Sequence, residues 1–273
     1  MAKEILIVVG IVVFAAAFRS CRKNWSRKLG AFLFLGASFL AFYFLTGCLC
    51  WGCFGIIAWF FLPWIELLTR VRKLRLPMEN RLVHKDAPED DFFPNASKAL
   101  AAMSEADFEH VGDSAWKWAG MEQYFLLHWN PEERASAAVC LCEQDKVAFA
   151  FISITSKTED GKTYRTTNFP FSQTLKHSPN FFWNHVPCEK NCFHQVLLDH
   201  RAYLQKQKIA ESDLRTPDPD LLEEEIEQEM REQIQHNLDQ KIIEPTDGNN
   251  FRYSKRGFFF LWKQFVKDML RLC

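Results

Sequence analysis

The 273-residue chain is predicted to be an integral membrane protein in which α-helical membrane segments precede a cytoplasmic α+β domain. Three observations predict this class. Residues 30–68 form a nearly continuous apolar stretch, and clusters of basic residues stand at both of its ends. The region that follows alternates like β-strands and then continues with helical periodicity.

The apolar stretch is too long for one membrane span and has the length of two. A span needs about 20 residues, because a helix rises about 1.5 Å per residue and a bilayer core is roughly 30 Å thick. We therefore predict a helical hairpin with spans over about 29–47 and 51–68. Residues 5–18 are also apolar, and we interpret them as a retained first span, because the preceding residues lack the basic charge of a signal peptide. The predicted transmembrane region is residues 1–77.

Basic residues define the predicted orientation of these spans. One cluster lies between the first and second spans, and another follows the third. A hairpin puts both clusters on the same side, which the positive-inside rule assigns to the cytoplasm together with everything that follows. The residues expected at the membrane interface are Trp25, Arg27, Lys28, Arg70, Arg72, Lys73 and Arg75.

The composition excludes some partners. Of the 33 Lys and Arg and 34 Asp and Glu residues, the first 69 positions hold six and two, so residues 70–273 carry a net charge of −5. A nucleic-acid-binding domain needs a basic face, so the expected partners are the lipid bilayer and an unidentified protein, without nucleic acid.

The nine cysteines do not suggest a disulfide framework, because a cytoplasmic domain keeps its thiols reduced. Cys48, Cys50 and Cys53 lie in the predicted hairpin turn. We interpret them as compact apolar residues, with metal binding or redox sensing at the outer face as the alternative.

After a tether over residues 78–95, the soluble α+β domain is predicted to occupy residues 96–273. Its strands are expected at 108–112, 123–129, 136–142, 146–156 and 163–168. Short connections between the later strands predict an antiparallel meander. The fourth strand is apolar on both faces, so it is expected to be central and covered on both sides.

Helices are predicted at 97–103, 191–209, 218–243 and 254–272. The acidic third helix has only a narrow apolar stripe, so it is expected to be largely solvated. The last helix has an aromatic face and a basic face. We favour packing of the aromatic face on the domain's own sheet. The alternative is that this helix lies on an anionic membrane surface, with Trp262, Lys263 and Lys267 at the interface.

One cluster combines potential metal ligands: His185, Cys188, Cys192 and His194. Two thiolates and two imidazoles can close a tetrahedral zinc site, and a thiol at a helix start can be reactive. However, known zinc sites join two separated ligand pairs, and no second pair is evident. We therefore predict neither a metal site nor a cofactor.

The sequence has no phosphate-binding loop, nucleophile elbow or dinucleotide fingerprint. The expected function is therefore non-enzymatic: a membrane-anchored protein whose cytoplasmic domain binds a partner protein or the inner membrane surface. One alternative is a thiol- or metal-dependent enzyme or sensor centred on Cys188 and Cys192. A transporter or channel component ranks last, because the spans offer few polar groups beyond Ser38, Tyr43 and Glu66.

Overall fold

The computed structural model describes residues 2–21, 24–88, 93, 96–144, 147–187 and 192–271. The chain forms two compact units, which we name the helical unit (residues 1–73 and 255–273) and the sheet domain (residues 74–254). The sheet domain is thus inserted between two parts of the helical unit. This division differs from the predicted domain over 96–273, because the last helix belongs to the helical unit.

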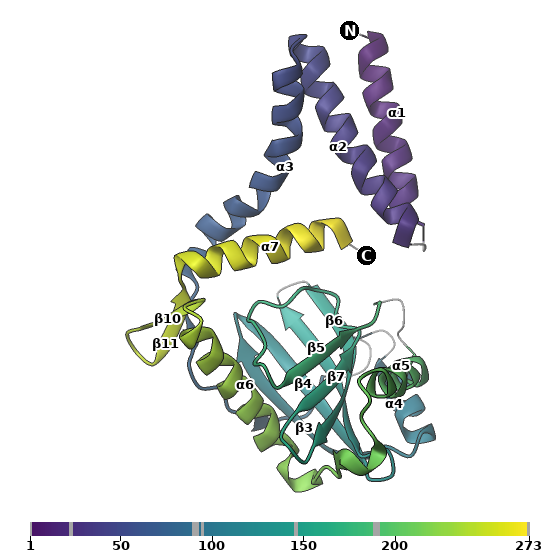
Figure 1. Cartoon of the computed structure of the whole chain (residues 1–273), viewed down its shortest axis with the longest axis vertical. Coiled ribbons are helices and arrows are strands. Elements are labelled where there is room, and N and C mark those ends of the chain that lie inside the picture. Colours follow the sequence, from purple (N-terminus) through teal and green to yellow (C-terminus); the bar gives the residue numbers. More distant parts are fainter. Residues whose placement is uncertain are drawn as a thin grey trace. The chain divides into compact units, whose positions relative to one another are not determined.

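The helical unit contains four helices, α1 (Ala2–Arg19), α2 (Asn24–Thr46), α3 (Leu49–Thr69) and α7 (Lys255–Arg271). Figure 1 shows α2 and α3 as a hairpin, with α1 packed along α2. Gly47 has a φ of +68°, which permits the chain reversal. Glycine also allows close helix packing: a Cβ atom at Gly52 would lie 2.6 Å from the Phe39 ring.

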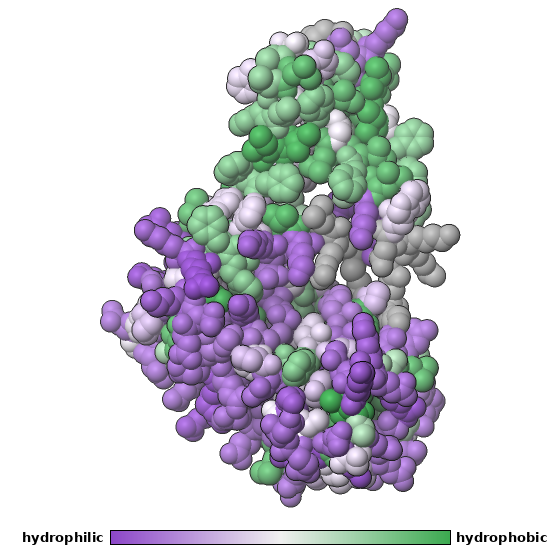
Figure 2. Space-filling view, viewed as in Figure 1, coloured by the Kyte–Doolittle hydropathy of each residue, from purple (hydrophilic) through white to green (hydrophobic). Residues whose placement is uncertain are grey.

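Among the described residues, two helical segments are long and apolar enough to cross a membrane, Trp25–Thr46 and Leu49–Lys73. In the most apolar 18-residue stretch of each segment, only 17% and 22% of the residues are buried within the structure, unlike the core helix of a soluble protein. The surface of the first three helices is accordingly mainly hydrophobic in Figure 2. Helix α1 is not one of the two, and it carries Lys3, Glu4 and Arg19. A third span therefore remains a prediction.

The sheet domain contains an eight-stranded sheet whose main path runs β2-β3-β4-β5-β6-β7-β8, with β9 paired to β6. The strands are β2 (Val83–His84), β3 (Glu109–Trp118), β4 (Met121–Asn130), β5 (Ala135–Gln144), β6 (Val147–Thr158), β7 (Thr163–Thr167), β8 (Phe181–His185) and β9 (Leu214–Arg215). The predicted antiparallel meander is confirmed for β3 to β7. Strand β8 pairs parallel to β7, and β2 brings part of the predicted tether into the sheet.

Helices cover both faces of this sheet (Figure 1). One face packs on α4 (Ala96–Glu105) and α5 (Phe193–Lys206), around a core that includes the fully buried Met103 and Ile154. Helix α6 (Leu222–Asp239) crosses the opposite face. Short 3-10 turns lie at Val71–Lys73, Glu211–Asp213 and Pro219–Leu221.

A second, three-stranded sheet consists of β1 (Leu76–Pro77), β10 (Ile243–Thr246) and β11 (Asn250–Tyr253). Strand β1 follows the exit of the chain from the helical unit, and β11 precedes its return. The two strands pair, with Leu76 opposite Phe251. Both side chains are buried, so this pairing fixes the two connections next to each other.

Candidate functional site

The contact between α7 and α3 defines the candidate functional site of the helical unit. The indole Nε1–H of Trp262 donates a hydrogen bond to the backbone carbonyl oxygen of Phe60 at 2.7 Å. The rings of Trp64 and Phe259 meet edge to face, with centroids 5.3 Å apart. The apolar face of α7 therefore packs on α3. Packing of the other apolar residues of this helix on the domain's sheet stays a prediction.

This contact lies close to Pro63 of α3. Proline has no backbone N–H, so Pro63 cannot donate the usual helical bond to the carbonyl of Trp59. Membrane helices tolerate such an interruption when neighbouring groups bond to the local backbone. Trp262 donates to the next carbonyl along the helix, that of Phe60, and the Trp59 indole donates to Ser38 Oγ on α2 at 2.6 Å. Helix α3 is thereby tied to both α2 and α7.

The exposed side of α7 is basic. Lys255, Arg256, Lys263 and Lys267 are exposed. Phe259 is 58% exposed although its ring contacts Trp64, so apolar surface continues beyond the contact with α3. A helix with exposed aromatic residues beside lysines has the pattern of helices that lie in a membrane interface.

The predicted interface residues of the helical unit gather at one end of the hairpin. The end of α1 and the start of α2 lie at the same end as the C-terminus of α3, and α7 lies across this end (Figure 1). Trp25 is 72% exposed, and Lys28, Arg70, Arg72 and Lys73 are exposed as well. Arg27 is half-buried, and its Nε donates to the Cys21 carbonyl oxygen at 3.2 Å. Arg75, also exposed, falls in the sheet domain.

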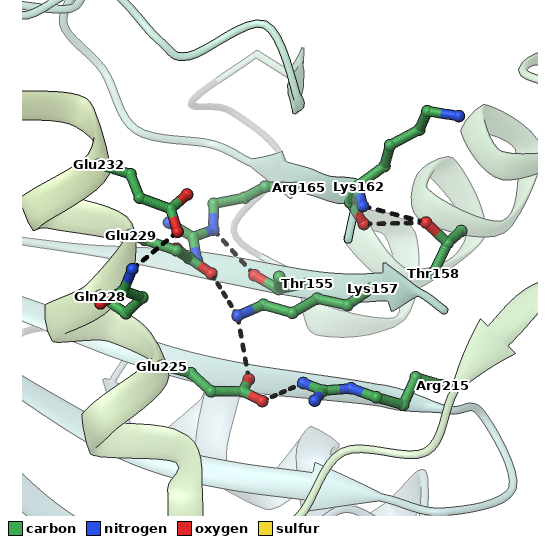
Figure 3. Close-up of polar contacts among 10 residues, drawn as sticks. All are labelled: Thr155, Lys157, Thr158, Lys162, Arg165, Arg215, Glu225, Gln228, Glu229 and Glu232. Carbon is green, nitrogen blue, oxygen red and sulfur yellow. Dashed lines mark hydrogen bonds and ion pairs between the residues drawn. The ribbon is translucent and has the colours of Figure 1, made fainter. Parts of the chain in front are cut away.

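A second polar cluster lies in the sheet domain, between α6 and the strands (Figure 3). Lys157 of β6 contacts Glu225 at 3.1 Å and Glu229 at 2.9 Å. Arg165 of β7 contacts the other oxygen of Glu229 at 2.6 Å. Arg215 of β9 pairs with Glu225. The two carboxylates therefore bridge three cations from three strands.

Charges of opposite sign face each other between α6 and the strands. Burial alone would raise the pKa of Glu229, but the neighbouring Arg165 and Lys157 hold that pKa below its ordinary value. Glu229 is therefore ionised at neutral pH. The prediction of a largely solvated α6 is wrong at this face, where the side chains of Glu225 and Glu229 are only 16% and 13% exposed. We interpret the network as structural, since its carboxylates already hold cations.

The candidate metal ligands of the sequence, for which no metal site was predicted, contact different partners in the described part of the chain. His185 Nε2 lies 2.7 Å from the Phe169 carbonyl oxygen, and His194 Nε2 lies 3.4 Å from Glu105. Cys192 is exposed at the N-cap of α5. Cys188 lies outside the described residues. Within the described ranges, no group of three or more His, Cys, Asp or Glu side chains could hold a metal ion.

One buried histidine was not singled out from the sequence as a site residue. His200 of α5 is 2% exposed, and its nitrogens lie 3.1 Å from Ser156 Oγ and 2.9 Å from Thr166 Oγ1. Burial lowers the pKa of His200 to about 4, so its ring is neutral at physiological pH. A serine next to a histidine suggests nucleophilic catalysis, but both groups are buried in the packed core. We therefore interpret the contact as structural.

The few polar groups of the predicted spans are engaged locally. Ser38 accepts from Trp59 and donates to the Phe34 carbonyl, and Glu66 pairs with Arg70 at 3.3 Å. These contacts do not favour a transport path. Comparisons with protein-family models, curated proteins and solved structures gave no match, so the contacts above carry the functional argument.

Proposed function

We propose that this chain is an integral membrane protein that the α2–α3 hairpin anchors, with the basic ends of the hairpin in the cytoplasm. In this proposal, α7 lies along the anionic inner surface, and the sheet domain, on the same side of the membrane, binds a partner protein. The hydrogen bond from Trp262 to Phe60 is the observation that carries the proposal.

The exposed apolar residues of the hairpin support its insertion. Phe61, Ile65 and Leu68 are 61%, 62% and 53% exposed. Soluble monomers rarely expose large contiguous apolar patches, because such surface is costly in water. Small residues at the α2–α3 contact are also typical of membrane helix pairs. A Cβ atom at Gly55 would lie 2.7 Å from the Phe42 ring.

The chemistry of α7 supports its place at the surface. Indole rings favour the headgroup level, where an apolar ring and a polar N–H are both accommodated. Lysine side chains near an anionic leaflet contribute about 1 kcal/mol each. Lys263 and Lys267 are exposed on α7, and α7 lies across the end of the hairpin where α3 is followed by Arg70, Arg72 and Lys73 (Figure 1). The same surface can therefore attract all of these cations.

The two connections to the helical unit pair with each other inside the sheet domain. Leu76 and Phe251 hold the outgoing and returning chain together. Phe251 also contacts the Trp118 ring of β3, with centroids 6.0 Å apart, and the Tyr253 hydroxyl donates to the Thr174 carbonyl at 3.2 Å. The sheet domain is therefore joined to the helical unit through two adjacent connections rather than one.

The test is hydrogen exchange of α7 in the full chain, reconstituted into neutral bilayers and into bilayers with anionic phospholipid. The proposal predicts slower exchange of α7 amides in the anionic bilayer. The double variant Lys263→Glu and Lys267→Glu should remove this difference. The control Lys98→Glu reverses an exposed charge on α4 and should leave the difference unchanged. Equal exchange in both bilayers for the unmodified chain would contradict the proposal.

A further inference from the structure

The path of the eight-stranded sheet ends at β8, which pairs parallel to β7 on one side. The Thr163 N–H donates to the Asn180 carbonyl oxygen at 2.9 Å, and the Val186 N–H donates to the Thr167 carbonyl oxygen at 3.0 Å. Backbone groups alternate in direction along a strand, so these bonds define which residues of β8 face β7. The even-numbered residues bond to β7, and the odd-numbered residues direct their N–H and C=O groups away from it.

The outward backbone groups of β8 belong to Phe181, Trp183 and His185. The Phe181 N–H donates to the Ser178 carbonyl oxygen at 3.1 Å, within the turn that precedes the strand. The N–H groups of Trp183 and His185 have no backbone partner among the residues that the structure describes. An edge with free donors and acceptors can pair with a further strand.

The opposite edge of the sheet is protected against such pairing. Strand β2, only two residues long, covers part of β3 and is followed by Lys85, whose N–H donates to the Asp113 carbonyl oxygen at 3.2 Å. The register of β3 shifts between His110 and Gly112, as at a β-bulge. Very short edge strands, charged residues and bulges all disfavour the addition of another strand.

Strand β8 has none of these protections. Its five residues, Phe-Phe-Trp-Asn-His, include neither a charged residue nor proline, and its register with β7 is regular. Arg165, the one charged residue of β7, already contacts Glu229 at 2.6 Å. This edge therefore matches an uncharged strand better than an acidic or a basic peptide.

The aromatic side chains of β8 are held in place before any pairing. The His177 ring stacks on Phe181 and on Trp183, with centroids 4.4 Å and 4.8 Å apart. The His185 side chain lies 2.7 Å from the Phe169 carbonyl oxygen. A strand whose side chains are already ordered loses little conformational entropy when it pairs.

We propose that β8 pairs antiparallel with β8 of a second copy of this chain, with Trp183 at the two-fold axis. Each copy then donates from Trp183 and His185 and accepts at Phe181 and Trp183. The cross-strand neighbours are the two Trp183 residues, and Phe181 with the second copy's His185. Aromatic pairs of this kind stabilise antiparallel strands, and the pairing places no like charges opposite each other.

The assembly closes at two copies. A two-fold contact uses the same surface on both partners, so pairing consumes the β8 edge of each. The protected β2–β3 edge prevents further growth. The inference names the partner protein of the function proposed above, but the strand pairing itself requires neither the placement of α7 nor insertion of the hairpin.

The size of the contact predicts its strength. Stable soluble dimers bury about 1,200 Å² or more, and an edge of five residues is only about 17 Å long. The pair is therefore expected to dissociate on dilution. Anchoring in a membrane raises the effective concentration of the copies, so the dimer should form at high protein density.

Charge reversal at the two-fold axis tests the proposal in the full chain. Trp183→Lys and Trp183→Glu each place like charges opposite each other, which should raise the dimer dissociation constant on the order of tenfold. Sedimentation equilibrium in density-matched detergent measures this constant. An equal mixture of the two variants pairs lysine with glutamate and should restore association. The control Phe171→Lys changes an exposed aromatic residue outside β8 and should leave association unchanged.

Two results of that experiment would overturn the proposal. One is a parent chain that stays monomeric at every protein-to-detergent ratio. The other is a mixture of the two variants that associates no more tightly than either variant alone.

Hydrogen exchange of the parent chain tests the same contact without a substitution. In vesicles at two protein-to-lipid ratios, the amides of Trp183 and His185 should exchange more slowly at the higher ratio. Equal exchange at both ratios would overturn the strand pairing. Exchange of α7 in the same samples reports on the proposed function separately, so the two failures are distinguishable.

Discussion

The indole of Trp262 donates a 2.7 Å hydrogen bond to the backbone carbonyl of Phe60, although 202 positions separate the two residues. This bond places the last helix beside α3, and its acceptor, Phe60, lies three residues before Pro63. Apolar packing alone is non-directional, whereas a hydrogen bond to one carbonyl selects one position of α7 along α3. The amphipathic helix is therefore part of the helical unit rather than a free segment.

Trp262→Phe tests the contribution of this bond. The variant keeps an aromatic ring but removes the N–H donor, which is expected to cost about 1 kcal/mol. Helix α7 should then open more often, and its amides should exchange about fivefold faster in bilayers. Trp25→Phe is the control, because Trp25 is exposed at the start of α2. Equal exchange of α7 in both variants would contradict the assigned role of Trp262.

Glu229→Gln tests the ion network between α6 and the sheet. The substitution leaves Lys157 and Arg165 half-buried opposite a neutral amide, so we expect the sheet domain to lose about 2 kcal/mol of stability. Glu224→Gln on the exposed side of α6 is the control. Urea unfolding of the full chain in detergent, followed by near-ultraviolet circular dichroism, measures both. Equal loss in the two variants would show that the network contributes nothing specific.

The same carboxylate gives a pH dependence with a defined sign. Because the pKa of Glu229 is lowered in the folded state, its contribution is fully present above the ordinary pKa of 4.5 and is lost as the pH falls through the folded value. The stability difference between the parent chain and Glu229→Gln should therefore narrow only below about pH 4.5. A difference that narrows between pH 8 and 6 would contradict this assignment.

Protonation of His200 in the unfolded chain should lower the stability of the folded state at a higher pH than protonation of Glu229 does. Its pKa is about 4 in the folded state against an ordinary 6.5, so the unfolded chain binds the proton first as the pH falls. Stability from the neutral ring is thus fully present above pH 6.5 and declines toward pH 4. The loss should reach about 2 kcal/mol near pH 5. His200→Gln should show a smaller decline than the exposed control His84→Gln, and identical declines would contradict the prediction.

Cys140 and Cys142 should be inert toward thiol reagents in the folded protein. Both lie in β5 and are almost completely buried, and burial raises the pKa of Cys142 to about 12 and that of Cys140 still further. Maleimide should modify the exposed Cys192 in native protein but modify these two only after denaturation. Rapid modification of either one in the native state would show that β5 is not central.

The sequence predicts the elements that depend on local pattern. Alternating apolar residues and short turns predict the meander from β3 to β7, and the double apolar face of β6 predicts a strand covered on both sides. The length and composition of residues 30–68 predict two helices, which the structure contains as α2 and α3. These features follow from burial and period, which neighbouring residues determine.

Sequence patterns do not predict the features that depend on contacts between residues far apart in the chain. An acidic helix with a narrow apolar stripe suggests a solvated surface, because the cations that neutralise Glu225 and Glu229 lie on three separate strands. A usable signal was present: Lys157 and Arg165 occupy alternating strand positions that face a covered side of the sheet. The contact of α7 with α3 was missed for a similar reason, because it depends on one carbonyl of α3 that is 202 positions away from Trp262.

The most direct measurement of the central claim is the membrane topology of the hairpin. Reporter domains are fused in the full chain at Leu49, in the α2–α3 turn, and at Arg75, after α3. Membrane insertion of the hairpin predicts that the two reporters lie on opposite sides, with the Arg75 reporter in the cytoplasm. Reporters on the same side would contradict the two-span hairpin and the cytoplasmic placement of the sheet domain.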